Sequence, residues 1–367
     1  IGMPLEQTAE LLNTMARKGL IFSIETEGRP PAYMASQFVV GIWEYHVKSL
    51  DKELIKDFNE YVPFLMDVMM QNKTQQLRVI PISKKIAADA RIMAYEDAEK
   101  IIRSQSKIVV APCICRTEHA MVGKGCDKPR ENCLVFASGA YFYEENKLGR
   151  SISQDQALDI LKEGIAAGLV LQPGNSREVL YMCCCCGCCC AALRTIRHLP
   201  TPAAWVASPF GVVFNGETCE GCGVCLERCP MEAIRRVDGQ IDVDVDRCIG
   251  CGLCVSTCPT GSLALKRKSE ARREKMPRDT VASLYALGRA RGKLGLGKVF
   301  AVDEPAAGGA KFLCHCAGAL LSTTGRLGDA GSMLNISWVR VSRSTMPRSC
   351  SRGIVWRLVP LLSWLIE

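Results

Sequence analysis

The spacing of hydrophobic residues predicts a helix, a hairpin and a second helix near the start of the chain. Apolar positions recur at helical spacing over residues 5–17, and residues 20–38 then form two extended runs joined by a turn at 27–30. Residues 44–70 again carry apolar positions along one helical side. Pro63 is expected to break or kink this helix, because proline has no backbone N–H and clashes with the preceding turn.

Short apolar runs and amphipathic segments alternate through the middle of the chain. This alternation predicts a mixed α/β region, because short apolar runs suit strands and longer segments with a 3.6-residue period suit helices. Ser153 stands in front of one expected helix as its N-cap. The expected strands are 77–82, 108–111, 169–171 and 179–181, and the expected helices are 87–103, 154–167 and 279–291.

The cysteine content adds chemistry to this pattern. The chain of 367 residues contains 22 cysteines, although it is long enough to bury an ordinary apolar core without crosslinks. The cysteines fall in tight groups separated by long cysteine-free stretches, which is typical of metal or cluster ligands rather than of a disulfide scaffold. We therefore expect a reducing, cytoplasmic compartment and thiolates that bind iron.

Charge and hydropathy point away from nucleic acid and membranes. The net charge of +8 is mild for this length, and the basic run 266–275 is typical of a solvated linker. The longest apolar run, 354–366, contains Arg357 and Pro360 and is shorter than the roughly 20 residues that a membrane helix needs. No membrane span is expected, and the chain contains no recognisable site for a small-molecule substrate.

The most specific motif is a cysteine run that occurs twice between residues 219 and 259. Each copy has the pattern C-x2-C-x2-C-x3-C-P, the bacterial run for two [4Fe-4S] clusters in which the fourth cysteine binds the other cluster. Zinc would favour two separated pairs of ligands instead. The crossing rule assigns Cys219, Cys222, Cys225 and Cys258 to cluster 1, and Cys248, Cys251, Cys254 and Cys229 to cluster 2.

This repeat resembles the two-cluster bacterial ferredoxins over residues 206–267. The resemblance implies their fold of β-hairpins and short helices, with a strand within residues 241–246, and it implies one-electron transfer between redox partner proteins. Together with the APCICR sequence that begins at Ala111, the chain resembles ferredoxin-type proteins of anaerobes that carry a long cysteine-rich N-terminal extension.

Two further groups of cysteines precede the repeat. Cys113, Cys115, Cys126 and Cys133 lie within one short segment, and they could bind an iron–sulfur cluster, bind zinc or remain free thiols. His119, between them, is expected to be a surface or hydrogen-bonded residue rather than a ligand.

The second group is the sequence MCCCCGCCC, with Cys183, Cys184, Cys185 and Cys186 before Gly187 and Cys188, Cys189 and Cys190 after it. Alternation along a strand prevents these thiols from serving one cluster unless Gly187 allows a loop. The strands before Cys113 and Cys183 could end on the same side of one sheet, which would let both groups line additional clusters. The alternative is that several of these thiols are simply small buried residues. The candidate extra site comprises Cys113, Cys115, Cys126, Cys133, Cys183, Cys185, Cys186, Cys188, Cys189 and Cys190.

These observations predict an α+β protein of four segments. Residues 1–75 form a helical region, and the helix and hairpin within it resemble the second half of a winged helix. Residues 76–205 form a cysteine-rich α/β domain, 206–267 a 2[4Fe-4S] ferredoxin domain, and 268–367 a basic linker, a helix and an irregular tail.

The expected function is electron transfer, as a ferredoxin or as an electron-transfer subunit of an anaerobic redox system. The alternative is a redox-sensing iron–sulfur regulator that binds DNA through the winged-helix-like region. A third hypothesis is thiol or disulfide chemistry in the cysteine block, which would make the chain an enzyme subunit.

Overall fold

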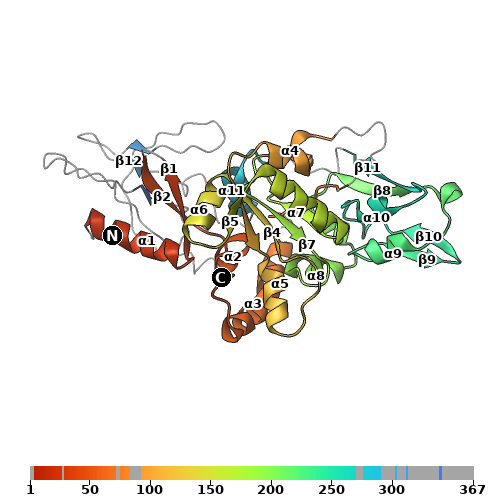
Figure 1. Cartoon of the computed structure of the whole chain (residues 1–367), viewed down its shortest axis with the longest axis horizontal. Coiled ribbons are helices and arrows are strands. Elements are labelled where there is room, and N and C mark those ends of the chain that lie inside the picture. Colours follow the sequence, from red (N-terminus) through yellow and green to blue (C-terminus); the bar gives the residue numbers. More distant parts are fainter. Residues whose placement is uncertain are drawn as a thin grey trace. The chain divides into compact units, whose positions relative to one another are not determined.

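A computed structural model shows helices and several small sheets, in agreement with the expected α+β class (Figure 1). None of the helices it describes is both long and apolar enough to cross a membrane. The cysteines at 314, 316 and 350 and the glycine-rich segment 292–298 lie outside the described residues. The described residues are 4–26, 29–71, 75–82, 92–269, 276–290, 302–303, 311–312 and 339–340.

The chain divides into two compact units. The first comprises Ile1–Lys48, Tyr141–Leu148 and Leu284–Glu367, and the second comprises Ser49–Ala140 and Gly149–Ser283. This division rests on packing in space, whereas the four segments expected from composition follow the order of the sequence. Those segment boundaries stay a prediction.

The first unit contains the expected N-terminal helix and hairpin. Helix α1 (Leu5–Arg17) precedes strands β1 (Ile21–Thr26) and β2 (Arg29–Ala35), which pair antiparallel. Phe22 packs against Phe142, with 4.8 Å between the ring centroids, in a core that also holds Leu12 and Tyr33. The remaining described elements that belong wholly to this unit are η1 (Phe38–Ile42), α2 (Trp43–Tyr45), β12 (Val302–Asp303), β13 (Lys311–Phe312) and β14 (Val339–Arg340), and it also includes parts of α6 (Ala137–Glu145) and α11 (Thr280–Ala290).

The single helix expected over residues 44–70 is wrong in extent. It is two helices, because Asp51 starts α3 (Lys52–Gln71) by accepting a hydrogen bond from the Leu54 N–H at 2.8 Å. Pro63 does not end α3. Pro63 is exposed, and on a solvent-facing side the carbonyl that loses its helical partner can bind water instead.

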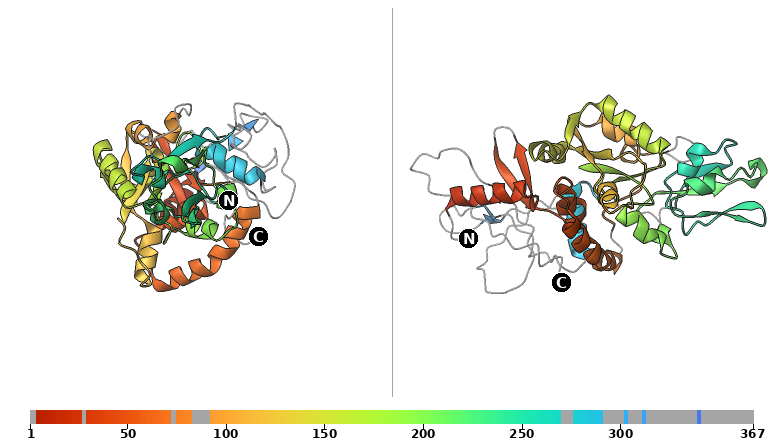
Figure 2. Two further views of the ribbon diagram at one scale, coloured as in Figure 1. Left: turned by 90° about the vertical axis from the view of Figure 1, so that its right-hand side faces the viewer. Right: turned by 60° about the horizontal axis from the view of Figure 1, so that its bottom comes forward.

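The second unit is built on a five-stranded antiparallel sheet in the order β5-β3-β4-β7-β6. Helix α7 (Gln154–Ala166) and helix α4 (Ala98–Arg103) pack on one face of this sheet (Figures 1 and 2). The strands are β3 (Ile108–Pro112), β4 (Glu131–Phe136), β5 (Arg150–Ile152), β6 (Val170–Pro173) and β7 (Tyr181–Cys185).

Strand order brings the two upstream cysteine groups to one edge of the sheet. Strands β3 and β7 both pair antiparallel with β4, which lies between them. They are therefore parallel to each other and end on the same side. Cys113 directly follows β3, and the cysteine block includes the last residues of β7, so the expectation that these strands end together is confirmed.

Other helices and strands of this unit agree with expectation to different degrees. Helix α7 begins behind Ser153, whose hydroxyl accepts from the Gln156 N–H at 3.1 Å. Helix α11, of which only the first turn belongs to this unit, is also present. The helix expected over 87–103 is wrong in extent: residues 83–91 lie outside the described part, and Asp97 caps α4 after the short turn η2 (Ala94–Glu96). Residues 77–82 form isolated bridges instead of a strand.

Around the repeated cysteine run the chain forms two small hairpins and two short helices. Strand β8 pairs with β11, and β9 pairs with β10, which contains part of the strand expected within 241–246. Two helices of five residues each, α9 and α10, follow the two cysteine loops. The bounds are β8 (Phe210–Phe214), α9 (Val224–Arg228), β9 (Ile234–Val237), β10 (Gln240–Val243), α10 (Leu253–Thr257) and β11 (Leu263–Arg267).

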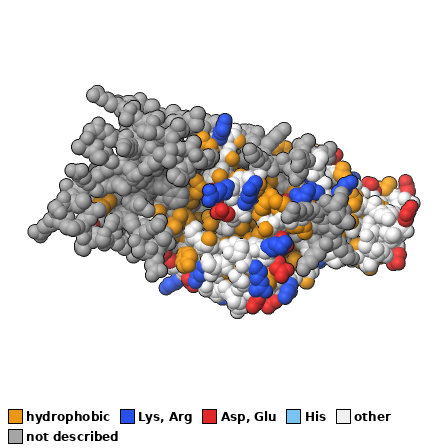
Figure 3. Space-filling view, turned by 90° about the horizontal axis from the view of Figure 1, so that it is seen from above, with side chains coloured by type: hydrophobic (Ala, Val, Ile, Leu, Met, Phe, Trp, Pro, Cys, Tyr) orange, Lys and Arg blue, Asp and Glu red, His pale blue; other side chains and the backbone are white. Residues whose placement is uncertain are grey.

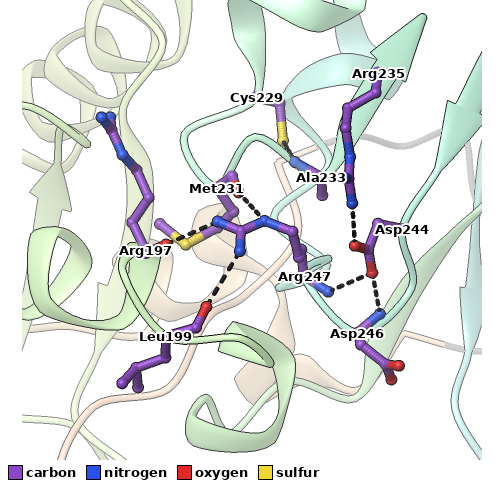
Figure 4. Close-up of polar contacts among 9 residues, drawn as sticks. All are labelled: Arg197, Leu199, Cys229, Met231, Ala233, Arg235, Asp244, Asp246 and Arg247. Carbon is purple, nitrogen blue, oxygen red and sulfur yellow. Dashed lines mark hydrogen bonds and ion pairs between the residues drawn. The ribbon is translucent and has the colours of Figure 1, made fainter. Parts of the chain in front are cut away.

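Arginine side chains attach this region to the rest of the second unit. Arg247 donates hydrogen bonds to the carbonyl oxygens of Met231 at 2.9 Å, Leu199 at 3.1 Å and Arg197 at 2.7 Å (Figure 4). Arg228 donates to the last carbonyls of α7, those of Ile165 and Ala166, at 2.9 Å each. These bonds satisfy carbonyls that a helix end otherwise leaves unpaired.

A further ion pair joins Arg267 of β11 to Glu96, whose side chain is only 3% exposed. The same guanidinium lies 4.6 Å from the centre of the Phe210 ring. A carboxylate this deeply buried requires a charged partner, so the pair holds β11 against the segment before α4.

We predict that Arg247→Ala lowers the free energy of unfolding by about 3 kcal/mol, because three carbonyls lose a charged donor. Arg235→Ala is the matched control, since Arg235 makes an exposed ion pair with Asp244, which contributes less than about 1 kcal/mol. Denaturant unfolding followed by far-ultraviolet circular dichroism under anaerobic conditions measures both. Equal losses in the two variants would contradict the bridging role of Arg247.

Glycines at equivalent places in the repeat provide a second test. Gly221 and Gly250 both have φ of +67°, but an added Cβ at Gly250 would lie 2.1 Å from the Phe210 carbonyl oxygen, whereas at Gly221 the nearest atom is 3.8 Å away. Gly221→Ala is expected to cost about 1–2 kcal/mol through its backbone conformation alone. Gly250→Ala is expected to cost at least about 2 kcal/mol more, because the backbone must move. The same unfolding measurement checks this difference, and similar values would disprove the close contact.

Candidate metal centres

The first set of repeat cysteines converges at the surface of the second unit. Burial raises the pKa of the Cys225 thiol, and negative charge on Cys222, Cys219 and Cys258 raises it further. These four residues are therefore electrostatic neighbours although Cys258 belongs to the second copy of the motif. Cys222 is exposed. The four cysteines assigned by the crossing rule to cluster 1 face one another at an accessible edge.

The second set surrounds a buried apolar cavity. Cys229, Cys248, Cys251 and Cys254 line one cavity together with Val212, Ile234, Ile249 and Leu253. Burial raises the pKa of Cys251 to about 12, so this thiol would stay protonated at neutral pH unless a metal bound it. Four thiols that converge on an apolar cavity are the donor set that a [4Fe-4S] cluster requires. Cys229 reaches this cavity from the first copy of the motif.

Backbone N–H groups point at the sulfurs of both sets. The Gly221 N–H donates to Cys219 Sγ at 3.4 Å, and the Ala233 N–H donates to Cys229 Sγ at 3.3 Å (Figure 4). Such bonds stabilise negative charge on cluster sulfurs and raise the reduction potential. The loops around both sets therefore fit a [4Fe-4S] cluster in their donor chemistry.

The cysteine block divides its thiols between the two faces of the sheet. Cys183 and Cys185 of β7 pack with the apolar cluster that also contains the repeat cysteines Cys225, Cys248 and Cys251. The neighbouring Cys184 and Cys186 pack with the opposite cluster, beneath α7. The division follows from the two-residue alternation of a strand. The turn 187–189 then returns Cys189 to the α7 face and Cys190 to the other.

Five thiols form what we call the central group: Cys113, Cys115, Cys183, Cys185 and Cys190. Each thiol influences the pKa of the next along a row that runs from Cys113 to Cys115, Cys190, Cys185 and Cys183. Hydrogen bonding to Cys115, together with burial, raises the pKa of Cys113 well above its ordinary value. The central group joins the residues after β3 to those of β7, and its members Cys183, Cys185 and Cys190 share an apolar cluster with the repeat cysteines.

Four other thiols form the lateral group: Cys126, Cys186, Cys188 and Cys189. Their sulfur atoms all lie within 4.8 Å of one another, with 3.6 Å between Cys189 and Cys126 and 3.9 Å between Cys189 and Cys188. Burial opposes ionisation of Cys186, but hydrogen bonds from the Cys189 N–H, the Cys188 thiol and Arg116 lower its pKa to about 7. The lateral group thus already contains one thiol that ionises near neutral pH.

Arg116 lies between the central and lateral groups. Its side chain is 1% exposed and donates to the Cys184 carbonyl at 3.2 Å, to Cys186 Sγ at 3.6 Å and to Asn132 Oδ1. Burial alone would lower the pKa of Arg116, but negative charge on Cys113, Cys186 and Cys185 raises it. A buried guanidinium requires nearby negative charge, and Cys186, whose pKa is lowered to about 7, can supply it.

The four cysteines between residues 113 and 133 are close in sequence, but they lie at different places in the structure. Cys113 and Cys115 belong to the central group, Cys126 belongs to the lateral group, and Cys133 lies in β4 directly opposite Cys183 of β7. His119 donates from Nδ1 to the Cys115 carbonyl at 3.0 Å and accepts from Arg194 at Nε2. It is therefore hydrogen-bonded, as expected.

Sequence reasoning missed two contributions to the site. Arg116 was visible only as a neighbour of Cys115, and nothing local indicated that its side chain would be buried among thiols. The partition of the block into a central and a lateral group was also missed, since it depends on which residues of β7 face α7. None of the 19 cysteines that the structure describes is in a disulfide.

Comparison with known proteins agrees with the repeat. A family model described as a 4Fe-4S dicluster domain matches residues 211–259, a range that includes all eight repeat cysteines. A comparison with curated proteins finds no match. The chain therefore carries a 4Fe-4S dicluster domain, preceded by a cysteine-rich α/β region whose thiols gather at the end of one sheet.

Proposed function

We propose that the protein transfers electrons through two [4Fe-4S] clusters in its dicluster domain, as a ferredoxin or as an electron-transfer subunit of an anaerobic redox system. Cys219, Cys222, Cys225 and Cys258 would hold one cluster, and Cys229, Cys248, Cys251 and Cys254 the other. When bound, the clusters supply reversible one-electron chemistry. The chain's own residues hold them, direct N–H groups at their sulfurs and exclude water from one of them.

The observation that carries this proposal is the continuity between the dicluster domain and the central group. Cys185 and Cys190 share an apolar cluster with Cys248 and Cys251. An added Cβ at Gly187, in the cysteine block, would lie 3.2 Å from the Cβ of Pro230, the residue after Cys229. Electron transfer between centres requires close approach through packed protein, and this contact provides it. We propose that the central group holds a further centre that exchanges electrons with the buried cluster.

The two cluster positions suit different tasks. The set around Cys251 is enclosed and adjoins the cysteine block, whereas the set around Cys222 reaches the surface. Acidic side chains gather over the dicluster region on the face drawn in Figure 3, and Glu217, Glu220 and Glu227 near Cys222 are exposed. We infer that electrons leave or enter beside Cys222, at a surface that would attract a basic redox partner.

The DNA-binding alternative has less physical support. Helix α1 and the hairpin β1-β2 are present, but the resemblance to a winged helix stays a prediction. The charges of α1 and its cap are balanced, with Glu6 and Glu10 against Arg17 and Lys18. A helix that reads DNA needs a basic surface toward the phosphates. These charges favour the electron-transfer proposal.

Iron counting tests the dicluster assignment. We expect the full-length chain, reconstituted with iron and sulfide under anaerobic conditions, to bind at least about eight iron atoms. The double variant Cys251→Ala/Cys254→Ala should lose about four of them, because only the enclosed set loses ligands. Cys184→Ala is the matched control, since Cys184 is buried and belongs to neither set.

Electron paramagnetic resonance of the dithionite-reduced chain is the second measurement. Two clusters in one small domain broaden each other's spectra, and the double variant should show a single unbroadened signal. Fewer than about eight irons in the unmodified chain, or an unchanged count in the double variant, would refute the assignment.

A further inference from the structure

We infer that Cys126, Cys186, Cys188 and Cys189 form a site for one metal ion bound by four thiolates, zinc or a single iron, separate from any iron–sulfur cluster. This inference does not depend on the proposed electron transfer, because it concerns only the lateral group. It differs from the sequence-based expectation, in which these thiols joined Cys113 and Cys133 around a cluster or a zinc ion.

Sulfur spacing carries the inference. Four thiolates arranged tetrahedrally around one zinc ion with bonds of about 2.3 Å lie about 3.8 Å apart. In the lateral group Cys189 Sγ lies 3.6 Å from Cys126 Sγ and 3.9 Å from Cys188 Sγ, and all four sulfurs lie within 4.8 Å of one another. A [4Fe-4S] cluster binds each thiolate to a different iron atom and therefore spreads its ligands further apart.

The dicluster domain provides a comparison within the same molecule. Its eight cysteines are all among the described residues, and their assignment to [4Fe-4S] clusters follows from motif spacing. Across the described part of the chain, the lateral group is the only set of three or more potential metal ligands that meets the 4.8 Å limit. The sets assigned to clusters are thus more open than the lateral group, as the two kinds of centre require.

A local turn produces this spacing. The Cys190 N–H donates to the Cys186 carbonyl at 3.3 Å, which closes a turn directly after β7. Cys186, Cys188 and Cys189 therefore approach one point, and Cys126 reaches it from the loop between α5 (Ile114–Met121) and β4. Cys186 and Cys189 are buried whereas Cys188 is exposed, so a metal ion can enter from solvent.

The charges around the lateral group also suit a metal thiolate. Four thiolates on a divalent ion leave a net charge of about −2, which needs compensation in a partly buried site. Arg116 donates to Cys186 Sγ at 3.6 Å, and the Cys189 N–H hydrogen-bonds the same sulfur. Bonds of this kind from outside the ligand set orient thiolates and stabilise their charge.

A metal ion here would act as a structural clip. Four protein ligands leave no open position for a substrate, which is typical of structural rather than catalytic zinc sites. The clip would fasten the α5–β4 loop to the turn after β7. That turn also contains Gly187, which packs against Pro230, and leads into Cys190 of the central group. The metal would thereby hold the contact between the cysteine block and the dicluster domain.

Metal analysis of the full-length chain tests the inference. Zinc and iron per chain are measured by mass spectrometry for the unmodified protein, for Cys126→Ser/Cys188→Ser and for the control Cys184→Ser. We expect the double variant to lose one metal atom and the control to lose none. Loss of one zinc assigns the site to zinc, and loss of one iron assigns it to mononuclear iron. Loss of about four irons, or no loss, would overturn the inference.

X-ray absorption spectroscopy of the unmodified protein is a second test, and it does not require the double variant to fold. For zinc, which the iron clusters do not obscure, the unmodified protein should show four sulfur ligands at about 2.3 Å. If the site holds a single iron atom instead, a chelator should remove one iron per chain while the absorbance of the iron–sulfur clusters stays unchanged. A shell of nitrogen or oxygen ligands, or the absence of both metals from the site, would contradict the four-thiolate assignment. Neither outcome bears on the cluster count of the dicluster domain, so the two proposals fail separately.

Discussion

Successive side chains of a strand point to opposite faces of a sheet, and the candidate centres of the α/β region depend on this constraint acting on β7. Cys183 and Cys185 face the apolar cluster shared with the dicluster domain, while Cys184 and Cys186 face α7. Six of the seven nearly consecutive thiols thereby fall into the central or the lateral group, which have different geometries, and Cys184 belongs to neither. A helix or an irregular loop in place of β7 would impose no such separation.

The cost of burying charge explains how the two groups are held together. Arg116 is almost completely buried, and its guanidinium contacts Cys186 and lies near Cys113. A buried cation next to neutral thiols would be unfavourable, whereas next to metal-bound thiolates each charge compensates the other. The same logic applies at the edge of the dicluster region, where Arg267 pairs with the buried Glu96.

The dicluster region depends on the rest of the second unit for its position. Its own hairpins are short, and its contacts with the sheet domain include arginine bonds to helix-end carbonyls and the packing of Pro230 on Gly187. These contacts lie next to the enclosed cluster set rather than the exposed one. The arrangement separates the cysteine set around Cys251, inside the unit, from the exposed Cys222 at its edge.

The sequence by itself determined the repeated cluster motif and several individual elements. Ligands three residues apart on one loop are encoded locally, so the eight repeat cysteines could be named and paired without a structure, and the family match covers the same residues. Helix α7 behind its Ser153 cap was also predictable, because capping acts within one turn. The continuity of α3 through Pro63 was not predictable in this way, because the exposure of that proline to solvent depends on how the helix packs.

Only the tertiary structure decided how the other cysteines combine. Cys126 meets Cys189 from a separate loop, and Cys115 meets Cys190 because β3 and β7 end on the same side of a sheet whose strand order is non-local. Which face of β7 is covered by α7 also depends on pairing between distant strands. Spacing along the chain therefore specified the clusters whose ligands are local, whereas pairing across the sheet specified the central and lateral groups.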